Sequence, residues 1–308
     1  MHSSNGSAQR EIIDGLSRAK ACVSPKYFYD ALGCRLFEII THLPEYYPTR
    51  TEQRVMRRHA AEIAEAVGTG ATLIDLGAGN CAKARTLFPS IKPRQYVAVD
   101  ISTEFMNGSL SELHKLFPEI DMLAVGADLS AGLALPPTVL AASRVFFYPG
   151  SSIGNFDPPD ALALLSNIRQ LCSQRGGLLI GVDLIKERAI LEAAYDDELG
   201  ITAAFNLNLL SHLNRLIDSD FRLRDWRHRA IYSRAGSRIE MHLEAFDDVA
   251  VAWRGGGRRF SRGERIHTEN SYKYLLGDFK NLLAQAGFSQ SRVWTDDRQW
   301  FAVFYASV

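Results

Sequence analysis

The strongest constraint on the fold of this chain is a repeated alternation of short apolar runs with helical stretches, which begins near Thr72. Runs typical of buried strands cover residues 71–77, 94–100, 121–128 and 176–184, and a further strand runs from residue 143 into a glycine-rich loop that ends at residue 155. Helical spacing of apolar residues covers 83–88, 102–117 and 159–172. Strands that alternate with helices predict a parallel sheet with helices on both faces.

The pattern changes over residues 186–274. This region holds a helical stretch at 189–217, a β-segment at 238–246 and a run rich in Gly and Arg at 253–264. We interpret the last run as a solvated turn between two strands. Because the charge of the whole chain is neutral, its arginines indicate an exposed loop rather than a phosphate-binding patch.

The α/β pattern resumes after this region. A helix is predicted over 278–288, and strands over 291–296 and 301–306 are expected to form an antiparallel pair that closes the sheet. We therefore expect an α/β domain with an inserted module, and we expect the amino-terminal segment to pack with that module. The predicted domains are residues 50–185 with 275–308, and residues 10–49 with 186–274.

Composition and charge exclude several classes of partner. The 308 residues, 46% of them hydrophobic, are enough for a sizeable core. The 35 Lys and Arg residues balance 35 Asp and Glu residues, which indicates neither nucleic acid nor an anionic membrane as a partner. No apolar run reaches the roughly 18 residues that span a bilayer. The four cysteines form no CxxC pair, which predicts reduced thiols and no zinc site. We expect a soluble, cytoplasmic, monomeric protein that is an enzyme or binds a small molecule.

The segment LIDLGAGNCAK (73–83) ends one strand and opens a loop of the kind that binds nucleotides. Gly77 and Gly79 would let the backbone approach a ligand closely. A GxG fragment alone fits a structural tight turn equally well. Asp100 and Asp128 favour a ligand, because they end the next two strands, where acids can bind ribose hydroxyls and an adenine edge.

This loop lacks the phosphate-binding features of a dinucleotide site. The third glycine of that motif is absent, because Ala82 and Lys83 occupy that part of the turn. Asp75, directly before the loop, suits a cationic ligand better than a polyphosphate. We therefore expect an adenosine ligand without phosphates, and S-adenosylmethionine is the candidate.

The amino-terminal segment 24–53 is rich in aromatic residues. For any single tyrosine in it, a place in the core or in a turn is the simplest interpretation. Several tyrosines together near a glycine-rich loop would instead line a polar pocket that tolerates a cation, which suits an amine substrate. The aromatic residues are Tyr27, Phe28, Tyr29, Phe37, Tyr46 and Tyr47.

Six segments of the chain, in one order, resemble the ergothioneine-pathway L-histidine Nα-methyltransferases, and the resemblance covers nearly the whole length. It implies a Rossmann-like class I methyltransferase domain, with a mostly parallel sheet and an antiparallel last strand, plus an inserted α+β substrate domain. The segments are KYFYDALGCRLFEIITHLPEYYPTRTE, LIDLGAGNCAK, PGSSIGNF, AYDDELGITAAFN, RIEM and HTENSYKY.

The resemblance also implies which residues bind S-adenosylmethionine. The donor would lie along the glycine loop at Gly77, Gly79 and Lys83. Its ribose would meet Asp100, and its adenine would meet Asp128 and Leu129. No residue is assigned to a metal, and the spacing of His42, His212, His228, His242 and His267 suggests none.

For histidine, the resemblance implies that Asn155, Tyr29 and Tyr195 bind the carboxylate and the amine. Tyr29 and Asn155 would also hold a group that relays the amine proton. Phe37 and Tyr46 would shape the pocket, and Glu269 and Ser271 would read the imidazole, flanked by Met241.

Each of these assignments has a simpler alternative. Asn155 would stabilise its loop, and Tyr195 would be a half-exposed helical residue. Glu269 would be a solvated edge charge, and Met241 would be apolar packing.

The resemblance implies S-adenosylmethionine-dependent methylation of the α-amino group of L-histidine, to the trimethylated betaine hercynine. One alternative is an N-methyltransferase for another amino acid or amine such as tryptophan, against which Glu269 and Ser271 argue. A second is an NAD-linked oxidoreductase, and the missing third glycine argues against it. A third is a protein that binds the donor without turnover.

Overall fold

The computed structural model describes residues 2–308, and the chain divides into two compact units. Residues 48–186 and 272–308 form one, which we call the sheet unit. Residues 1–47 and 187–271 form the other, which we call the insertion unit. The chain thus passes from one unit to the other after residues 47, 186 and 271.

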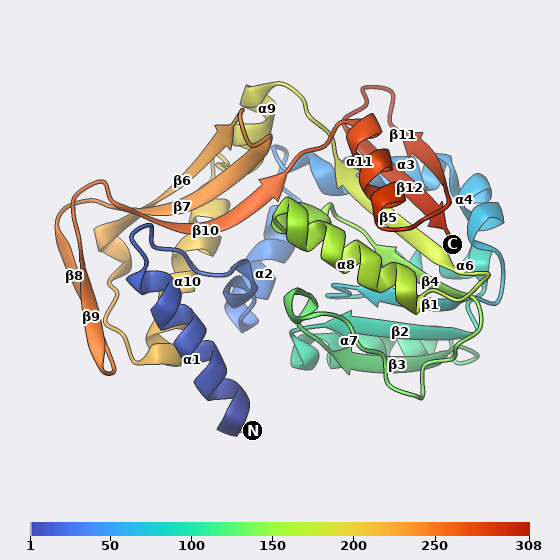
Figure 1. Cartoon of the computed structure of the whole chain (residues 1–308), viewed down its shortest axis with the longest axis horizontal. Helices are drawn as coiled ribbons and strands as arrows, with labels where there is room; N and C mark the ends of the chain where they lie inside the picture. Colours follow the sequence, from blue (N-terminus) through green and yellow to red (C-terminus); the bar gives the residue numbers. More distant parts are fainter. Residues whose placement is uncertain (1) are drawn as a thin grey trace. The chain divides into compact units, whose positions relative to one another are not determined.

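A seven-stranded sheet forms the centre of the sheet unit, in the order β11-β12-β5-β4-β1-β2-β3 (Figure 1). Strands β1 to β5 pair parallel to one another, whereas β12 runs antiparallel to both β5 and β11. The predicted parallel sheet with an antiparallel end is therefore confirmed. The strands are β1 (Thr72–Leu76), β2 (Gln95–Asp100), β3 (Asp121–Gly126), β4 (Arg144–Tyr148), β5 (Gly177–Asp183), β11 (Gln290–Thr295) and β12 (Phe301–Ser307).

Helices cover both faces of this sheet (Figure 1). Successive residues of a strand point to opposite faces, so Leu73 packs in one core with Ile63, and Ile74 packs in the other with Leu164. Burial of each such side chain stabilises the fold by about 1.5–3 kcal/mol. The helices are α3 (Tyr47–Arg58), α4 (Ala60–Val67), α5 (Ala82–Arg85), α6 (Phe88–Ile91), α7 (Thr103–Leu116), α8 (Pro158–Leu171) and α11 (Leu276–Gln285), with short 3₁₀ helices η2 (Leu129–Ala131) and η3 (Ser152–Asn155).

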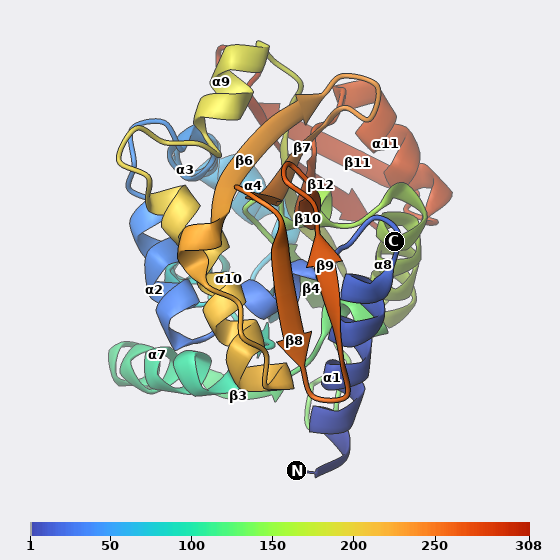
Figure 2. The ribbon, with the colours of Figure 1, turned by 90° about the vertical axis from the view of Figure 1, so that its left-hand side faces the viewer.

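An antiparallel sheet and a long helix organise the insertion unit (Figure 2). The sheet has the order β10-β7-β6, and a separate hairpin is formed by β8 and β9. Helix α10 packs against β6 and β7, and α1, α2 and η1 pack against α10. The elements are α1 (His2–Ser17), η1 (Pro25–Phe28), α2 (Ala31–Ile40), α9 (Arg188–Ala193), α10 (Ile201–Ile217), η4 (Leu223–Asp225), β6 (Trp226–Ser233), β7 (Arg238–Ala245), β8 (Val249–Trp253), β9 (Gly256–Phe260) and β10 (Arg265–Tyr272).

The helical stretch predicted over 189–217 is two helices, α9 and α10, rather than one. Asp197 causes the break, because its carboxylate accepts hydrogen bonds from the backbone N–H groups of Ile201 (2.9 Å) and Thr202 (2.7 Å) and so starts α10. Gly200, with φ +73°, supplies the left-handed residue that precedes the new helix.

The prediction of a solvated turn over 253–264 is wrong for most of that segment. Residues 256–260 form strand β9, which pairs with β8 and leaves only short turns at its ends. Arg258 is held rather than solvated, because its guanidinium donates to the carbonyl of Leu16 at 2.6 Å and lies 4.8 Å from the ring centre of Phe260. The glycines misled the prediction, because a strand can contain them where another backbone approaches closely.

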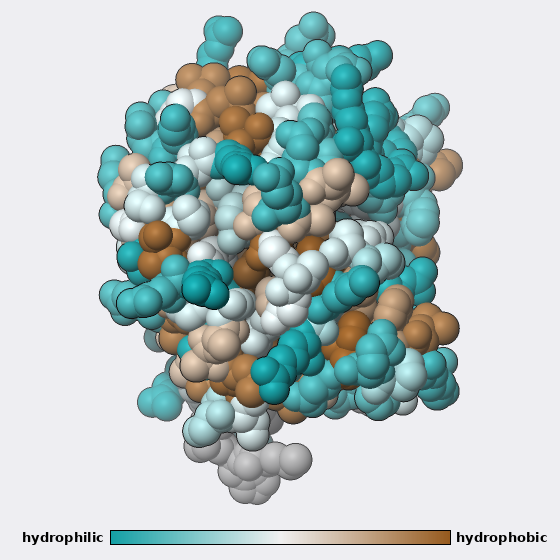
Figure 3. Space-filling model, turned by 90° about the vertical axis from the view of Figure 1, so that its right-hand side faces the viewer, coloured by the Kyte–Doolittle hydropathy of each residue, from teal (hydrophilic) through white to brown (hydrophobic). Residues whose placement is uncertain are grey.

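Hydrophobic side chains on the face shown in Figure 3 occur in small groups separated by hydrophilic ones. Large exposed hydrophobic residues of the sheet unit include Leu116, Leu275 and Val293, which lie on different elements or connections. Scattered exposure of this kind is ordinary and indicates no binding surface. Over the described residues, no helix combines the length and the apolar character needed to cross a membrane.

Candidate active site

The predicted donor residues gather at the carboxyl ends of neighbouring strands in the sheet unit. Strands β4, β1, β2 and β3 are adjacent and parallel, so their carboxyl ends share one edge of the sheet. Gly77 follows β1, Asp100 ends β2 and Asp128 follows β3. Because ligands of open α/β sheets bind at this edge, the structure brings these residues together where an elongated ligand would lie.

The loop after β1 has a backbone that glycine adopts without strain. Gly77 and Gly79 have φ values of +70° and +50°. A Cβ atom built on either residue would meet no heavy atom within 4 Å, so open space lies beside both. Positive φ combined with open space fits a backbone that a ligand approaches closely.

Asp100 holds this loop in place. Its Oδ2 accepts a hydrogen bond from the N–H of Gly79 at 2.9 Å, and its Oδ1 accepts one from the N–H of Ser102 at 2.9 Å. A carboxylate has about four acceptor positions, so further hydrogen bonds are possible. Asp100 can therefore organise the glycine loop and also accept hydrogen bonds from vicinal hydroxyls.

Asp128 and Leu129 follow β3. The Oδ1 of Asp128 accepts a hydrogen bond from the N–H of Ser130 at 2.9 Å and so caps η2. Leu129 packs against the apolar core that contains Val99. An acidic acceptor beside an apolar side chain suits a flat heterocycle with a polar edge, such as adenine.

Asp75, which the sequence suggested would favour a cation, is a buried residue of β1 with 2% exposure. Its Oδ2 accepts a hydrogen bond from the hydroxyl of Tyr96 at 2.7 Å. Its Oδ1 is buried and has no hydrogen-bond partner within the described part of the chain. Burial raises the pKa of Asp75 to about 7. Because this oxygen is buried and burial favours the neutral carboxyl, the role of Asp75 toward a cationic ligand stays a prediction.

Lys83, the third residue assigned to the glycine loop, has a partner that sequence reasoning missed. Its Nζ lies 2.6 Å from Oε2 of Glu52, which belongs to α3. The Oε1 of Glu52 accepts a hydrogen bond from the N–H of Gly150 at 2.7 Å. Glu52 is 3% exposed. The available signal was its place at the end of the PTRTE motif, which carries no chemical pattern of its own.

Four aromatic residues assigned to the substrate form a continuous series in the insertion unit. The ring centres of Tyr29 and Phe37 are 5.9 Å apart, those of Phe37 and Tyr46 are 6.2 Å apart, and those of Tyr46 and Tyr195 are 6.2 Å apart. Phe205 of α10, which the sequence did not single out, lies 6.0 Å from both Tyr29 and Phe37. Aromatic faces of this kind can stabilise a cation while excluding water.

Tyr195 and Ser271 are hydrogen-bonded to each other. Their hydroxyl oxygens are 2.7 Å apart, and the residues are 8% and 3% exposed. Tyr195 lies between α9 and α10, so it is not the half-exposed helical residue of the simpler alternative. The structure thus joins two residues that are 76 positions apart in the sequence.

A buried histidine, His228, forms a hydrogen bond with the backbone of Tyr195. Nε2 of His228 lies 2.7 Å from the carbonyl oxygen of Tyr195, and its Nδ1 lies 2.8 Å from Nδ2 of Asn206. Since an amide nitrogen is a donor, Nδ1 accepts and Nε2 carries the proton that bonds the carbonyl. Burial lowers the pKa of His228, which favours this neutral form. The sequence assigned His228 no role, because no spacing links it to Tyr195.

Met241 and Glu269 lie on neighbouring strands of the insertion-unit sheet, β7 and β10. Met241 is 2% exposed, and its carbonyl accepts a hydrogen bond from Oγ1 of Thr268 at 3.0 Å. Glu269 is 8% exposed, so it is not a solvated edge charge. The Met241 thioether is an apolar contact in either interpretation of its role.

Asn155 belongs to the sheet unit, unlike the other residues assigned to histidine. It ends η3, directly after β4 and its glycine-rich loop. Gly154 beside it has no room for a side chain, because a Cβ there would lie 2.8 Å from the carbonyl oxygen of Tyr272. The position of Asn155 is therefore set by close backbone packing.

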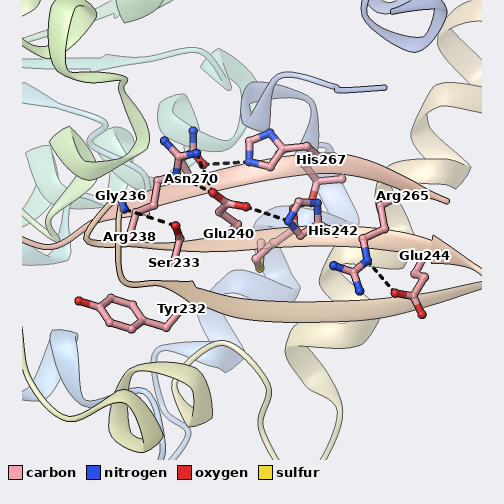
Figure 4. Close-up of polar contacts among 12 residues, drawn as sticks. Tyr232, Ser233, Gly236, Arg238, Glu240, His242, Glu244, Arg265, His267 and Asn270 are labelled. Carbon is pink, nitrogen blue, oxygen red and sulfur yellow. Dashed lines mark hydrogen bonds and ion pairs between the residues drawn. The ribbon is translucent and has the colours of Figure 1, made fainter. Parts of the chain in front are cut away.

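The remaining histidines of the sheet belong to polar contacts rather than to a metal site. Figure 4 shows His242 beside Glu240, and His267 beside Asn270, with nitrogen–oxygen distances of 3.2 Å and 2.9 Å. Burial lowers the pKa of His242 to about 4. Among the residues that the structure describes, no three His, Cys, Asp or Glu side chains could hold a metal ion together.

The same sheet also holds a buried acid, Glu244, among arginines. Its Oε2 accepts a hydrogen bond from Arg265 at 2.7 Å (Figure 4). Burial raises the pKa of Glu244, but hydrogen bonds from Arg227 and Arg265 lower it to about 2. This cluster is satisfied within itself and stabilises the sheet.

The chain is similar in sequence, over most of its length, to proteins of named function. It is 37% identical to the histidine N-alpha-methyltransferase of Mycolicibacterium smegmatis, over 94% of this chain and 91% of that protein. It is 32% identical to ergothioneine biosynthesis protein 1 of Neurospora crassa, over 87% of this chain and 31% of that much longer protein.

A solved structure agrees on the fold. An S-adenosylmethionine-dependent methyltransferase from Clostridium acetobutylicum superposes with a TM-score of 0.51 at 11% identity, covering 89% of this chain and 98% of that one. This likeness confirms the class I methyltransferase architecture that the sequence predicted.

The family profile described as "histidine-specific methyltransferase, SAM-dependent" matches residues 8–308. The match includes both the glycine loop of the sheet unit and the aromatic series of the insertion unit. The chain belongs to the family of histidine-specific, S-adenosylmethionine-dependent methyltransferases.

Proposed function

We propose that this protein transfers methyl groups from S-adenosylmethionine to the α-amino nitrogen of L-histidine, as far as the trimethylated betaine hercynine, in ergothioneine biosynthesis. The observation that carries the proposal is membership of the histidine-specific family over residues 8–308, together with the relatives named above. When bound, S-adenosylmethionine supplies a methyl group already activated on a sulfonium. The protein therefore needs only to bind and orient the two substrates and to exclude water from them.

The sheet unit holds the donor. Asp100 accepts hydrogen bonds from the ribose hydroxyls, and Asp128 and Leu129 hold the adenine. Gly77 and Gly79 let the loop backbone approach the ligand, and Lys83 binds its far end. The open space beside both glycines and the hydrogen bond from Gly79 to Asp100 support these roles.

The insertion unit recognises the amino acid, together with Asn155. Tyr29, Tyr195 and Asn155 bind its carboxylate and amine, and Glu269 and Ser271 bind the imidazole beside Met241. Glu269 is a buried acceptor, and an imidazole N–H can donate a hydrogen bond to its carboxylate whereas a phenyl ring cannot. This difference selects histidine over phenylalanine.

Repeated methylation ends in a quaternary ammonium, which the pocket must accept. The faces of Tyr29, Phe37 and Tyr46 stabilise such a cation, with an interaction of about 0.5–2 kcal/mol for each well-placed ring. The continuous series of ring contacts in the insertion unit supports this role. Phe37 and Tyr46 shape the space that admits each further methyl group.

The amine must lose a proton before it can act as a nucleophile, since an ammonium has no lone pair. Tyr29 and Asn155 hold the group, a hydroxyl or a water, that accepts the proton and passes it outward. Orientation of the neutral amine supplies most of the rate enhancement, because well-aligned partners gain about 7–11 kcal/mol.

The test is mass spectrometry of histidine and other amino acids incubated with the protein and S-adenosylmethionine. Histidine should gain one, two and then three methyl masses, and tryptophan and phenylalanine should gain none. Methylation of tryptophan in preference to histidine would refute the assignment of the substrate.

We also propose that the enzyme works as a monomer in the cytoplasm. None of its four cysteines forms a disulfide in the described part of the chain, which suits a reducing compartment. Light scattering coupled to gel filtration should give the mass of one chain, 34.3 kDa, and twice that mass would contradict the monomer.

A further inference from the structure

The strand order of the sheet unit indicates which part of the donor lies at which strand. Neighbours run β4-β1-β2-β3 along the edge where the ligand binds. If Asp128 after β3 meets the adenine and Asp100 of β2 meets the ribose, the sulfonium lies near the loop after β1. The amino-acid end of the donor then lies beside β4, which is followed by Gly150.

An ion pair lies at the β4 end of this strand order. Nζ of Lys83 lies 2.6 Å from Oε2 of Glu52, and the side chains are 31% and 4% exposed. Oε1 of Glu52 accepts the N–H of Gly150 at 2.7 Å. One buried carboxylate therefore fixes both a lysine of the glycine loop and the backbone of the loop after β4.

The surrounding backbone leaves room for this carboxylate. A Cβ atom on Gly181 of β5 would lie 2.1 Å from Oε1 of Glu52, and one on Gly150 would lie 2.9 Å from Nζ of Lys83. Two glycines thus have the space of their missing side chains filled by the ion pair. Glu52 stands over the sheet rather than on its periphery.

The charge at this place matches a zwitterion. Lys83 is partly exposed and presents a cation, and the carboxylate of Glu52 beside it is buried. The amino-acid end of S-adenosylmethionine carries one carboxylate and one ammonium. The Lys83 ammonium offers a counter-charge to the carboxylate, and the Glu52 carboxylate offers one to the ammonium.

We propose that the Glu52–Lys83 pair forms the part of the donor site that binds the zwitterionic amino-acid end of S-adenosylmethionine, with Glu52 as a positioning residue for Lys83 and for the Gly150 amide. The inference rests on the proposed donor site and adds Glu52, from outside the glycine loop, to it. Since Glu52 acts on one end of the ligand only, the adenosine end should be insensitive to its substitution.

The experiment compares two ligands by titration calorimetry on the whole protein. S-adenosylhomocysteine has the amino-acid end, and 5′-methylthioadenosine lacks it. Glu52→Gln keeps the size of the side chain but removes its charge. This variant should lower the affinity for S-adenosylhomocysteine at least about tenfold relative to wild type. Its affinity for 5′-methylthioadenosine should stay within about twofold of the wild-type value. The matched control is Glu65→Gln in α4, whose side chain is 75% exposed and which should change neither affinity.

Lys83→Gln should give the same selective loss, and it keeps the proposal testable if Glu52→Gln fails to fold. If either variant lowers the affinity for both ligands equally, the inference is overturned and the Glu52–Lys83 pair has only a structural role. No weakening of S-adenosylhomocysteine would overturn it as well. Wild-type protein that binds neither ligand would instead refute the proposed donor site itself.

Discussion

The hydroxyl oxygens of Tyr195 and Ser271 lie 2.7 Å apart, and both residues are buried in the insertion unit. Tyr195 comes from the connection between α9 and α10, whereas Ser271 comes from β10. The hydrogen bond therefore joins a residue proposed for the amine and carboxylate of histidine to one proposed for its imidazole. Each hydroxyl would hold the other in the orientation that the substrate requires.

Tyr195→Phe and Ser271→Ala should each lower kcat/KM for histidine by about tenfold, because each removes the buried hydrogen bond between the two hydroxyls. The double variant should lose less than the product of the two single losses, with a coupling of at least about 0.5 kcal/mol. Steady-state kinetics on the four proteins checks this. Strictly multiplicative losses would show that the two hydroxyls act separately.

His228→Asn should raise KM for histidine about tenfold with little change in kcat, because the shorter side chain cannot donate to the Tyr195 carbonyl. His228→Gln is the matched control, since its amide nitrogen lies near the position of Nε2 and keeps the donor. Its KM should stay within about threefold of wild type. If both variants raise KM equally, His228 only fills space.

Glu269→Ala should lower kcat/KM for histidine about 100-fold while the affinity for S-adenosylhomocysteine is unchanged. The loss follows from removing a buried carboxyl group to which the imidazole N–H would donate a hydrogen bond. Kinetics with histidine and calorimetry with S-adenosylhomocysteine give the two readouts. Equal losses in both would count against a role in reading the imidazole.

Asp100→Ala should abolish calorimetric binding of S-adenosylmethionine, a loss of at least about 100-fold. The substitution removes the proposed ribose acceptor and also the hydrogen bonds to the N–H groups of Gly79 and Ser102. Asp100→Asn retains one acceptor oxygen and should lose less. Unchanged affinity of the alanine variant would refute the ribose role.

Asp75→Asn should change how stability depends on pH. Burial raises the pKa of Asp75 from 3.8 to about 7, so between about pH 4 and pH 7 the folded protein holds a proton that the unfolded chain releases. This contribution therefore makes the free energy of unfolding fall as pH rises through that window. The variant, neutral at every pH, lacks this slope.

Relative to wild type, Asp75→Asn should therefore gain on the order of 2–3 kcal/mol of stability between about pH 5 and pH 8. Chemical denaturation at the two pH values measures the difference. An equal difference at both would show that Asp75 does not titrate in this range.

Much of the fold follows from local patterns. The strand runs, the helix at 159–172 and the antiparallel last pair were predictable, because burial on both faces makes parallel strands continuously apolar. The break between α9 and α10 was also readable in principle, since Asp197 and Gly200 are ordinary signals of a helix start. Strand β9, which lies inside the predicted turn, was not, because its glycines are typical of a turn.

The residues that support the proposed site divide in the same way. Gly77, Asp100 and Asp128 were predictable, since each stands at the end of a strand and the parallel sheet aligns those ends. Glu52 and His228 were not, because their partners lie far away in the sequence: Gly150 is 98 residues from Glu52, and Tyr195 is 33 residues from His228.

The order of residues alone thus predicted an α/β fold with acids at its strand ends, because periodicity and strand termination are local properties. Its family was readable from motifs for the same reason. Only the tertiary structure showed that the buried carboxylate of Glu52 pairs with Lys83 and that His228 bonds the backbone of Tyr195. Those contacts depend on side chains meeting across elements, and no short-range pattern encodes them.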